Sequence, residues 1–237
     1  MRKIVTILCF LTFLISCAGE KQHGFSLYEE GKYKEALPLL SEAGSSGDSQ
    51  AQYLLGNMYE NGLGVERDFN QAVYWLKRAA ESGHSEAQLA LGESHINGYG
   101  VPRNYSEAIR WITLAAKQLD SAQLMLGTIY YDGEIVEANK AESVKWYKLA
   151  AENGNALAQY YLSQYYAEGV GVDKDAIASH IWLNLAVSAG VSFAHEDLFR
   201  LEEKMSKKQI IIAQDLAVAC KENGFKDCGI VKNVMTQ

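Results

Sequence analysis

Residues 51–80 read AQYLLGNMYENGLGVERDFNQAVYWLKRAA, and recognisable copies of this block follow it along the chain. Its clearest marker is Trp75, which Trp111, Trp146 and Trp182 follow at intervals of 36, 35 and 36 residues. A small residue lies 19 positions before each of these tryptophans: Gly56, Gly92, Gly127 and Ser163. A period in this range indicates stacked supersecondary units that contact only their neighbours. The sequence therefore predicts a repeat protein with an extended surface, not a globule around one enclosed pocket.

Each repeat predicts a pair of helices. Ala51, Leu55 and Met58 fall on one face of a first helix, and the glycines at 62 and 64 indicate its end, because glycine readily adopts a positive φ. A second helix then begins at a capping residue. Three pairs have the spacing of a capping box: Asp68 with Gln71, Asn104 with Glu107, and Asn139 with Glu142. The predicted fold class is all-α, a right-handed superhelical α/α solenoid of repeated antiparallel helix pairs.

The small and aromatic residues of the repeat predict its packing. A glycine inside a helix costs about 0.5–1 kcal/mol relative to alanine, so the glycines at 56, 92 and 127 require a reason. We expect them to let the paired helix approach closely at Ala79 and Ala80, or at Ala115 and Ala116. The tryptophans are expected to fill space toward the neighbouring repeat, as core and not as a binding site. One glutamine recurs in every repeat, at Gln52, Gln88, Gln123 and Gln159, and predicts a structural hydrogen bond.

These residues resemble the Sel-one-like repeat, a relative of the tetratricopeptide repeat. The family pattern is small-xxx-Leu-Gly-xx-Tyr-xx-Gly-x-Gly-Val, followed by Asp, Ala, Trp-Tyr and Ala-Ala, and residues 51–80 nearly meet it. The resemblance implies four repeats, a degenerate leading repeat and a C-terminal helical cap. Their expected ranges are 51–86, 87–121, 122–157 and 158–193, with 26–50 before them and 194–237 after them. It also implies a function in protein interaction, because the family consists mainly of adaptors in envelope, secretion and signalling assemblies.

The repeats are not uniform. The second lacks a glycine near 119 and is one residue shorter, and the third has Glu134 and Ile135 where other loops continue to a glycine. We expect a different turn at both places. After residue 194 the tryptophan phase is lost, and the apolar pattern predicts two helices broken near Ser206. Four residues are expected to give this cap a polar outer face: Lys204, Lys207, Lys208 and Asp215.

The start of the chain predicts export. A basic pair, Arg2 and Lys3, precedes twelve uncharged residues at 4–15, which is too short for a membrane span. The sequence Leu14-Ile15-Ser16-Cys17 resembles the lipobox of bacterial lipoproteins, although an uncleaved signal anchor is an alternative interpretation. The resemblance implies a signal peptide at 1–16, a lipidated Cys17 and a tether at 17–25. Because Ala18 follows the cysteine, it further implies an outer-membrane location facing the periplasm.

The charge and the cysteines of the chain restrict the possible classes of function and the compartment. The 237-residue chain has a net charge of −7, and without residues 1–16 it has 20 Lys and Arg against 29 Asp and Glu. Such a chain lacks the basic footprint of a nucleic-acid-binding protein, and membrane affinity is expected from the acyl chains alone. Cys220 and Cys228 are candidates for one disulfide in an oxidising compartment, with free buried thiols as the alternative.

Binding residues are expected where the repeats differ, since the constant positions are explained by packing. In tetratricopeptide-like arrays the first helix of each pair lines the concave face, so its exposed positions predict a groove for a protein partner. These positions are Tyr53, Asn57, Glu60, Leu89, Glu93, Ile96, Leu124, Thr128, Tyr131, Tyr160 and Gln164. The competing interpretation is that they are ordinary helix-surface residues.

Catalytic patterns are absent from the sequence. Ser-x-x-Lys, His-Glu-x-x-His, Gly-x-Ser-x-Gly and phosphate-loop motifs do not occur, and the histidines show no ligand spacing. We therefore expect no catalytic residue, cofactor, metal or small-molecule substrate, and predict a non-enzymatic adaptor. Two alternatives stay open. One is binding or slow hydrolysis of cell-wall or β-lactam-like ligands, as cysteine-rich relatives suggest, although only Cys220 and Cys228 match their Cys-x7-Cys spacing. The other is a purely structural spacer.

Overall fold

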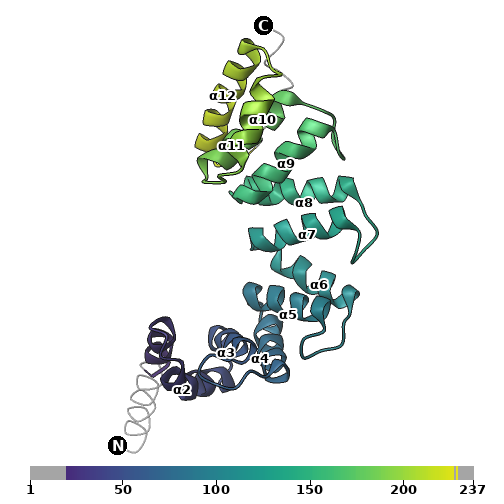
Figure 1. The fold of residues 1–237 in the computed structure, drawn as a ribbon. Helices are drawn as coiled ribbons and strands as arrows, with labels where there is room; N and C mark the ends of the chain where they lie inside the picture. The colour runs from purple at the N-terminus through teal and green to yellow at the C-terminus, as the bar shows by residue number, and fades with distance from the viewer. Residues whose placement is uncertain (1–19, 227, 229–237) are drawn as a thin grey trace, which may run out of the picture. The chain divides into compact units, whose positions relative to one another are not determined.

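The structure is a computed structural model that describes residues 20–226 and 228, and in that part every regular element is a helix (Figure 1). Residues 20–29 form the first described helix. The others are α2 (Tyr33–Ser45), α3 (Ser49–Asn61), α4 (Phe69–Glu81), α5 (Ser85–Asn97), α6 (Tyr105–Ala115), α7 (Asp120–Asp132), α8 (Lys140–Glu152), α9 (Ala156–Glu168), α10 (Ala176–Ser188), α11 (Ala194–Glu202) and α12 (Lys207–Glu222). Consecutive helices pack in pairs, as the repeat predicts: α3 with α4, α5 with α6, α7 with α8, and α9 with α10.

The chain divides into two compact units. Unit 1 ends at Ala115 with α6, and unit 2 begins at Ala116 ahead of α7. The expected signal peptide, Cys17 and the first residues of the tether lie outside the described residues. None of the described helices is both long enough and apolar enough to span a bilayer.

Each hairpin turns at a glycine and restarts at a capping side chain. The first helices of the four pairs end at Gly62, Gly98, Gly133 and Gly169, whose φ angles lie between 69° and 78°. Asp68, Asn104, Asn139 and Asp175 then accept backbone N–H groups at the start of the second helices. The N–H groups of these four residues donate to the carbonyls of Tyr59, His95, Tyr130 and Tyr166 at 2.8–2.9 Å. One residue thus both caps the second helix and ties it to the first.

Only one of the two hydrogen bonds of each predicted capping box forms, so the prediction of the second bond is wrong. Asp68, Asn104 and Asn139 accept the expected N–H bonds, but no return bond from Gln71, Glu107 or Glu142 forms within the described residues. The N–H that such a bond would satisfy is already bonded to the preceding helix. Glu107 and Glu142 instead pair with Arg110 and Lys145, each at 2.8 Å. A complete capping box does form at Ser206 and Gln209, where α12 begins.

The glycines inside the first helices do allow close approach, but against other residues than expected. A Cβ atom added at Gly56 would lie 2.6 Å from Leu76 Cγ, and one at Gly92 would lie 2.5 Å from Ile112 Cγ1. At Gly127 the neighbour is the ring of Tyr147. The expected partners Ala79 and Ala80 instead belong to a cluster with α5 and Trp111. The reason is helical phase, because the residue that faces the glycine lies one turn before these alanines.

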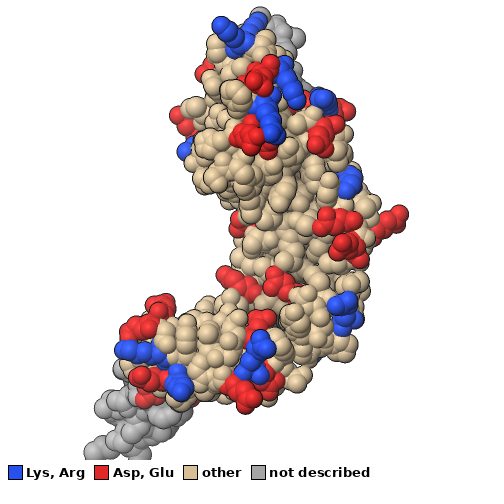
Figure 2. Space-filling view, in the orientation of Figure 1, with Lys and Arg blue, Asp and Glu red and all other residues tan. Residues whose placement is uncertain are grey.

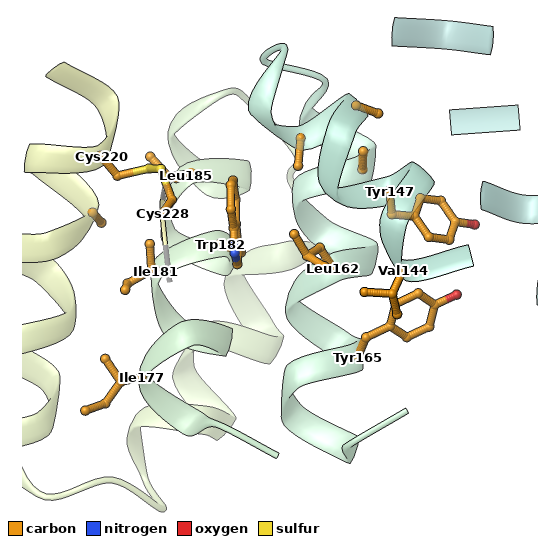
Figure 3. Close-up of a cluster of buried hydrophobic side chains, with 14 of the residues drawn as sticks. Val144, Tyr147, Leu162, Tyr165, Ile177, Ile181, Trp182, Leu185, Cys220 and Cys228 are labelled. Atoms are coloured by element: carbon orange, nitrogen blue, oxygen red, sulfur yellow. A yellow bond between two sulfur atoms is a disulfide. The ribbon is translucent and has the colours of Figure 1, made fainter. Parts of the chain in front are cut away.

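Trp75 and Trp111 fill space toward the preceding helix pair, as predicted. Trp111 is buried among residues of α4 and α5, and Trp75 packs against the cluster of α2 and α3. Trp182 is fully buried in the cluster shown in Figure 3, where Leu162 and Ile181 lie beside it.

The second loop glycine lies against the preceding second helix. A Cβ added at Gly100 would lie 2.1 Å from the carbonyl oxygen of Phe69, the first residue of α4. Gly64 and Gly171 are similarly close to the backbone at Tyr33 and Lys140. The third repeat has Ile135 at this position, without the positive φ of its glycine counterparts, which confirms the expected difference in turn.

The C-terminal helices close unit 2. α11 and α12 are separated near Ser206, as predicted, and Lys204, Lys207, Lys208 and Asp215 are exposed. Cys220 and Cys228 form a disulfide with Cα atoms 5.3 Å apart, and Figure 3 shows it beside Leu185. The bridge joins the end of α12 to the residues after it and lies within the core cluster of α8, α9 and α10.

Candidate functional site

The recurrent glutamines are structural, as predicted. The Nε2 atoms of Gln52, Gln88, Gln123 and Gln159 donate to the carbonyls of Gly44, Ala80, Ala116 and Ala151 at 2.7–3.2 Å. Gly44, Ala80 and Ala151 lie at the ends of α2, α4 and α8, and Ala116 lies in the turn before α7; carbonyls at such places have no partner within a helix. All four side chains are buried. These glutamines therefore join successive repeats and are unavailable for recognition.

The variable positions of unit 1 form one surface, which we call the unit-1 face. It consists of Tyr53, Asn57 and Glu60 on α3 and Leu89, Glu93 and Ile96 on α5, and all six are half-buried. The Tyr53 ring stacks on His84 with centroids 4.7 Å apart. His84 in turn lies 2.9 Å from Gln50, so α5 begins beside α3.

The unit-1 face has polar groups on both helices. Asn57 Oδ1 accepts a hydrogen bond from the Tyr28 hydroxyl at 3.0 Å. The carboxylates of Glu60 and Glu93 have no hydrogen-bond or ion-pair partner among the described residues. In Figure 2, acidic side chains lie over the region of α5 among uncharged neighbours.

Burial and mutual repulsion act on the acids of the unit-1 face. Burial raises the pKa of Glu60. Burial and, to a lesser extent, the charge of Glu60 raise the pKa of Glu93. The pKa of Tyr53 is also raised, first by burial and then by the charges of Glu86, Glu60 and Glu93. The face therefore carries negative charge that is only partly solvated, and the described part of the chain places no Lys or Arg in an ion pair with it.

The predicted residues of unit 2 are largely occupied by contacts within the unit. Thr128 Oγ1 lies 2.9 Å from the Tyr147 hydroxyl, and Leu124 packs against the core cluster. The Tyr160 hydroxyl donates to Asp197 Oδ2 at 2.9 Å, and Gln164 Nε2 donates to Ser163 Oγ at 3.4 Å. Burial and the bond to Asp197 raise the pKa of Tyr160 to about 12.

Tyr131 stays partly accessible, with 39% of its surface exposed. The Lys140 ammonium lies 3.3 Å from its ring centroid, and the ring stacks on Tyr165 at 5.6 Å. Tyr131 begins a run of ring contacts with centroid separations of 4.8–5.6 Å. The run continues through Tyr165, Tyr147, Tyr161, Tyr160 and Phe193.

Two exposed rings of this run were missed by the sequence analysis. Tyr161 is 40% exposed and Phe193 is 55% exposed. Tyr161 follows Tyr160 directly but was not among the positions predicted to be exposed, and Phe193 lies where the repeat ends. Neither carries a signal in the sequence that would have identified it.

Among the residues that the structure describes, no group of three or more His, Cys, Asp or Glu side chains could hold a metal ion. The buried His180 has its Nε2 2.8 Å from Glu202 Oε1, and the described part places no hydroxyl or thiol in hydrogen-bond contact with that ring. This pair joins α10 to the end of α11 and has the role of a packing contact.

Paired helices, loop glycines and glutamines that bind the preceding helix define a class of α-helical repeat protein. The Sel1 repeat pattern matches residues 49–84, 85–118, 120–155 and 156–191, which is more than half of the chain. The chain belongs to the Sel1 repeat family. Proteins of this family are typically non-enzymatic scaffolds that mediate protein–protein interaction.

Two solved structures share this architecture. A Sel1 repeat protein from Oxalobacter formigenes is 32% identical, with a TM-score of 0.70 over 75% of this chain and 73% of that chain. A protective antigen present in uropathogenic Escherichia coli strains is 30% identical, with a TM-score of 0.76 over 88% of this chain. Our chain spans 46% of the length of that antigen. Among curated proteins, no relative matched.

Proposed function

We propose that this chain is a non-enzymatic adaptor that binds a protein partner through the first-helix faces of its repeats. One observation carries the proposal: the constant positions of the repeat are consumed by packing, whereas the variable positions gather on these faces. The glutamines bind neighbouring helices and the glycines touch them. The unit-1 face, by contrast, mixes apolar, aromatic and acidic side chains that are half-buried, a composition suited to a protein partner.

We further propose that the adaptor is a lipoprotein of the bacterial cell envelope. The support is the lipobox-like sequence Leu14-Ile15-Ser16-Cys17, and both of the similar solved structures described above come from bacteria. A disulfide between Cys220 and Cys228 suits an oxidising compartment. With Ala18 after the lipidated cysteine, the proposed location is the outer membrane, facing the periplasm.

Site-specific photocrosslinking in living cells tests the binding faces. A crosslinker would replace Leu89 in unit 1 or Thr128 in unit 2, with controls at Lys77 and Lys145, which are exposed on the second helices α4 and α8. We expect protein adducts of discrete mass from a first-helix position and none from the controls. Equal adducts from all four positions, or lipid adducts alone, would argue for a spacer without a specific partner.

The anchor is tested separately. Cells would be labelled with a clickable fatty acid, and the wild type would be compared with Cys17→Ser. The wild type is expected to carry label and to sediment with outer membranes, and the variant is expected to lose both properties. Membrane association without label would instead support the uncleaved signal anchor, and it would leave the proposed binding faces unaffected.

A further inference from the structure

Glu60 and Glu93 both belong to the unit-1 face and come from two different helices. Glu60 lies in the last turn of α3 and Glu93 lies in the middle of α5, close enough for the charge of Glu60 to act on Glu93. Both side chains are half-buried, and neither carboxylate has a partner among residues 20–226 and 228. Two carboxylates that lose part of their hydration without a cation destabilise the structure that holds them.

The repeat itself does not require these acids. The positions equivalent to Glu60 in the later repeats hold Ile96, Tyr131 and Ala167. The positions equivalent to Glu93 in the other repeats hold Asn57, Thr128 and Gln164. The same hairpin therefore forms with apolar or neutral residues at both sites. The paired acids are a property of the unit-1 face, and packing does not account for them.

The residues around Glu60 and Glu93 indicate which kind of side chain could bind there. Leu89 and Ile96 on α5, together with the Tyr53 ring on α3, offer apolar area beside the carboxylates. A long side chain with an apolar stem and a cationic head fits such a surface, because its methylenes cover the apolar area while its head reaches the charge. A guanidinium has five donors, so it can hydrogen-bond to more than one carboxylate oxygen.

We infer that the unit-1 face is a docking site for a protein segment that presents an arginine or lysine side chain among apolar residues, with the cation placed between Glu60 and Glu93. The inference rests on the proposed adaptor function and specifies the chemistry of the partner. Charge complementarity identifies the occupant, since the face supplies two negative charges and no positive one.

The first part of the test needs no partner. The full chain with Glu60→Gln and Glu93→Gln would be compared with the wild type by thermal unfolding at about pH 7.5. Its matched control is Glu29→Gln with Glu66→Gln, which removes the same charge from exposed positions of unit 1. We expect the face variant to melt above the wild type and above the control, because it no longer holds unpaired acids. A lower melting temperature would mean that these acids stabilise the free protein, and would overturn the inference.

The second part uses an array of randomised heptapeptides in three sets, with Arg or Lys, Glu, or Gln fixed at the central position. We expect the wild type to retain the cationic set about tenfold better than the Gln set. The Glu60→Gln and Glu93→Gln variant is expected to lose that preference, whereas the control variant keeps it. Retention of all sets equally would overturn the inference and leave the adaptor function standing. If no set is retained, both the inference and the proposed function at this face fail.

Discussion

One glutamine in each repeat shows how a constant polar residue can belong entirely to packing. Gln88 donates to the carbonyl of Ala80 at 3.1 Å, and both groups are buried. Spacing alone predicted this role, because a side chain that never varies between repeats must serve something that every repeat has. The carbonyls at the end of the preceding helix are such a feature.

Gln88→Ala is expected to lower the free energy of unfolding by about 1–2 kcal/mol, because a buried hydrogen bond is lost. Urea unfolding followed by circular dichroism would measure it. Gln118→Ala changes an exposed glutamine in the turn after α6 and is the control, expected to have little effect. Equal stabilities of the two variants would contradict the structural role of Gln88.

The half-buried acids of the unit-1 face predict a pH dependence. Because their folded pKa values are raised, protonation favours the folded state, and this stability is lost as the pH rises through the folded pKa values. The titratable groups around them are Tyr53, His84 and Glu86. The gain in melting temperature from Glu60→Gln with Glu93→Gln is therefore expected to be largest near neutral pH and to shrink toward about pH 4. A gain that does not change with pH would exclude these carboxylates as its cause.

At the scale of the element, the hairpin loop is set by a glycine that lies on the preceding helix. Gly100 has a φ of 68°, and an added Cβ would overlap the carbonyl of Phe69. Gly83 has a φ of 89°, but an added Cβ would meet nothing within 4 Å. A substitution at Gly83 would therefore cost only backbone strain, whereas one at Gly100 would cost backbone strain and steric overlap.

Gly83→Ala is expected to cost about 1–2 kcal/mol, the penalty of a left-handed conformation for a residue with a Cβ. Gly100→Ala pays the same penalty and must also displace the start of α4, so we expect a total loss of about 3 kcal/mol or more. Equilibrium unfolding of both variants would measure the difference. Equal losses would show that the loop moves away from α4 without resistance.

The sequence predicted helix positions, caps and turns well, because these depend on residues close together in the chain. The sequence-based prediction was wrong where more than one neighbouring group is available to a residue. Glu107 has the spacing to complete a capping box, yet it pairs with Arg110, because the N–H it would have accepted from is already bound to His95. The side chain that Gly92 meets is Ile112 and not the expected Ala115 or Ala116, since helical phase and not residue size decides which side chain faces the glycine.

For the candidate site, sequence placed the right residues on the first helices but could not tell an open face from an occupied one. In unit 1, Glu60 and Glu93 have no partner among the residues that the structure describes, whereas in unit 2 Tyr160 is bound to Asp197 from α11. That bond depends on α11, a helix of the C-terminal cap, whose sequence does not follow the repeat pattern. The contribution of Phe193 was missed for the same reason.

At the scale of the whole molecule, repeats contact mainly their neighbours, so disturbances are expected to stay local. Opening the bridge between Cys220 and Cys228 is expected to lower stability by about 2–3 kcal/mol, from the added freedom of a short loop. We expect faster hydrogen exchange in α10 and α12 after mild reduction, with α3 and α4 unchanged. The pair Cys220→Ala and Cys228→Ala controls for the reductant, and faster exchange throughout the chain would contradict local behaviour.

The contacts that join the repeats also bear on how such a chain can grow. Each repeat has a glutamine that donates to a carbonyl at the end of the repeat before it, and in the first, second and fourth repeats a loop glycine also lies against the start of the preceding second helix. A duplicated stretch of one repeat length would thus enter the gene with both of its junctions already compatible. An in-frame duplication therefore requires no new contacts where the copies join. Substitutions that distinguish one copy from another can then accumulate on the first-helix faces.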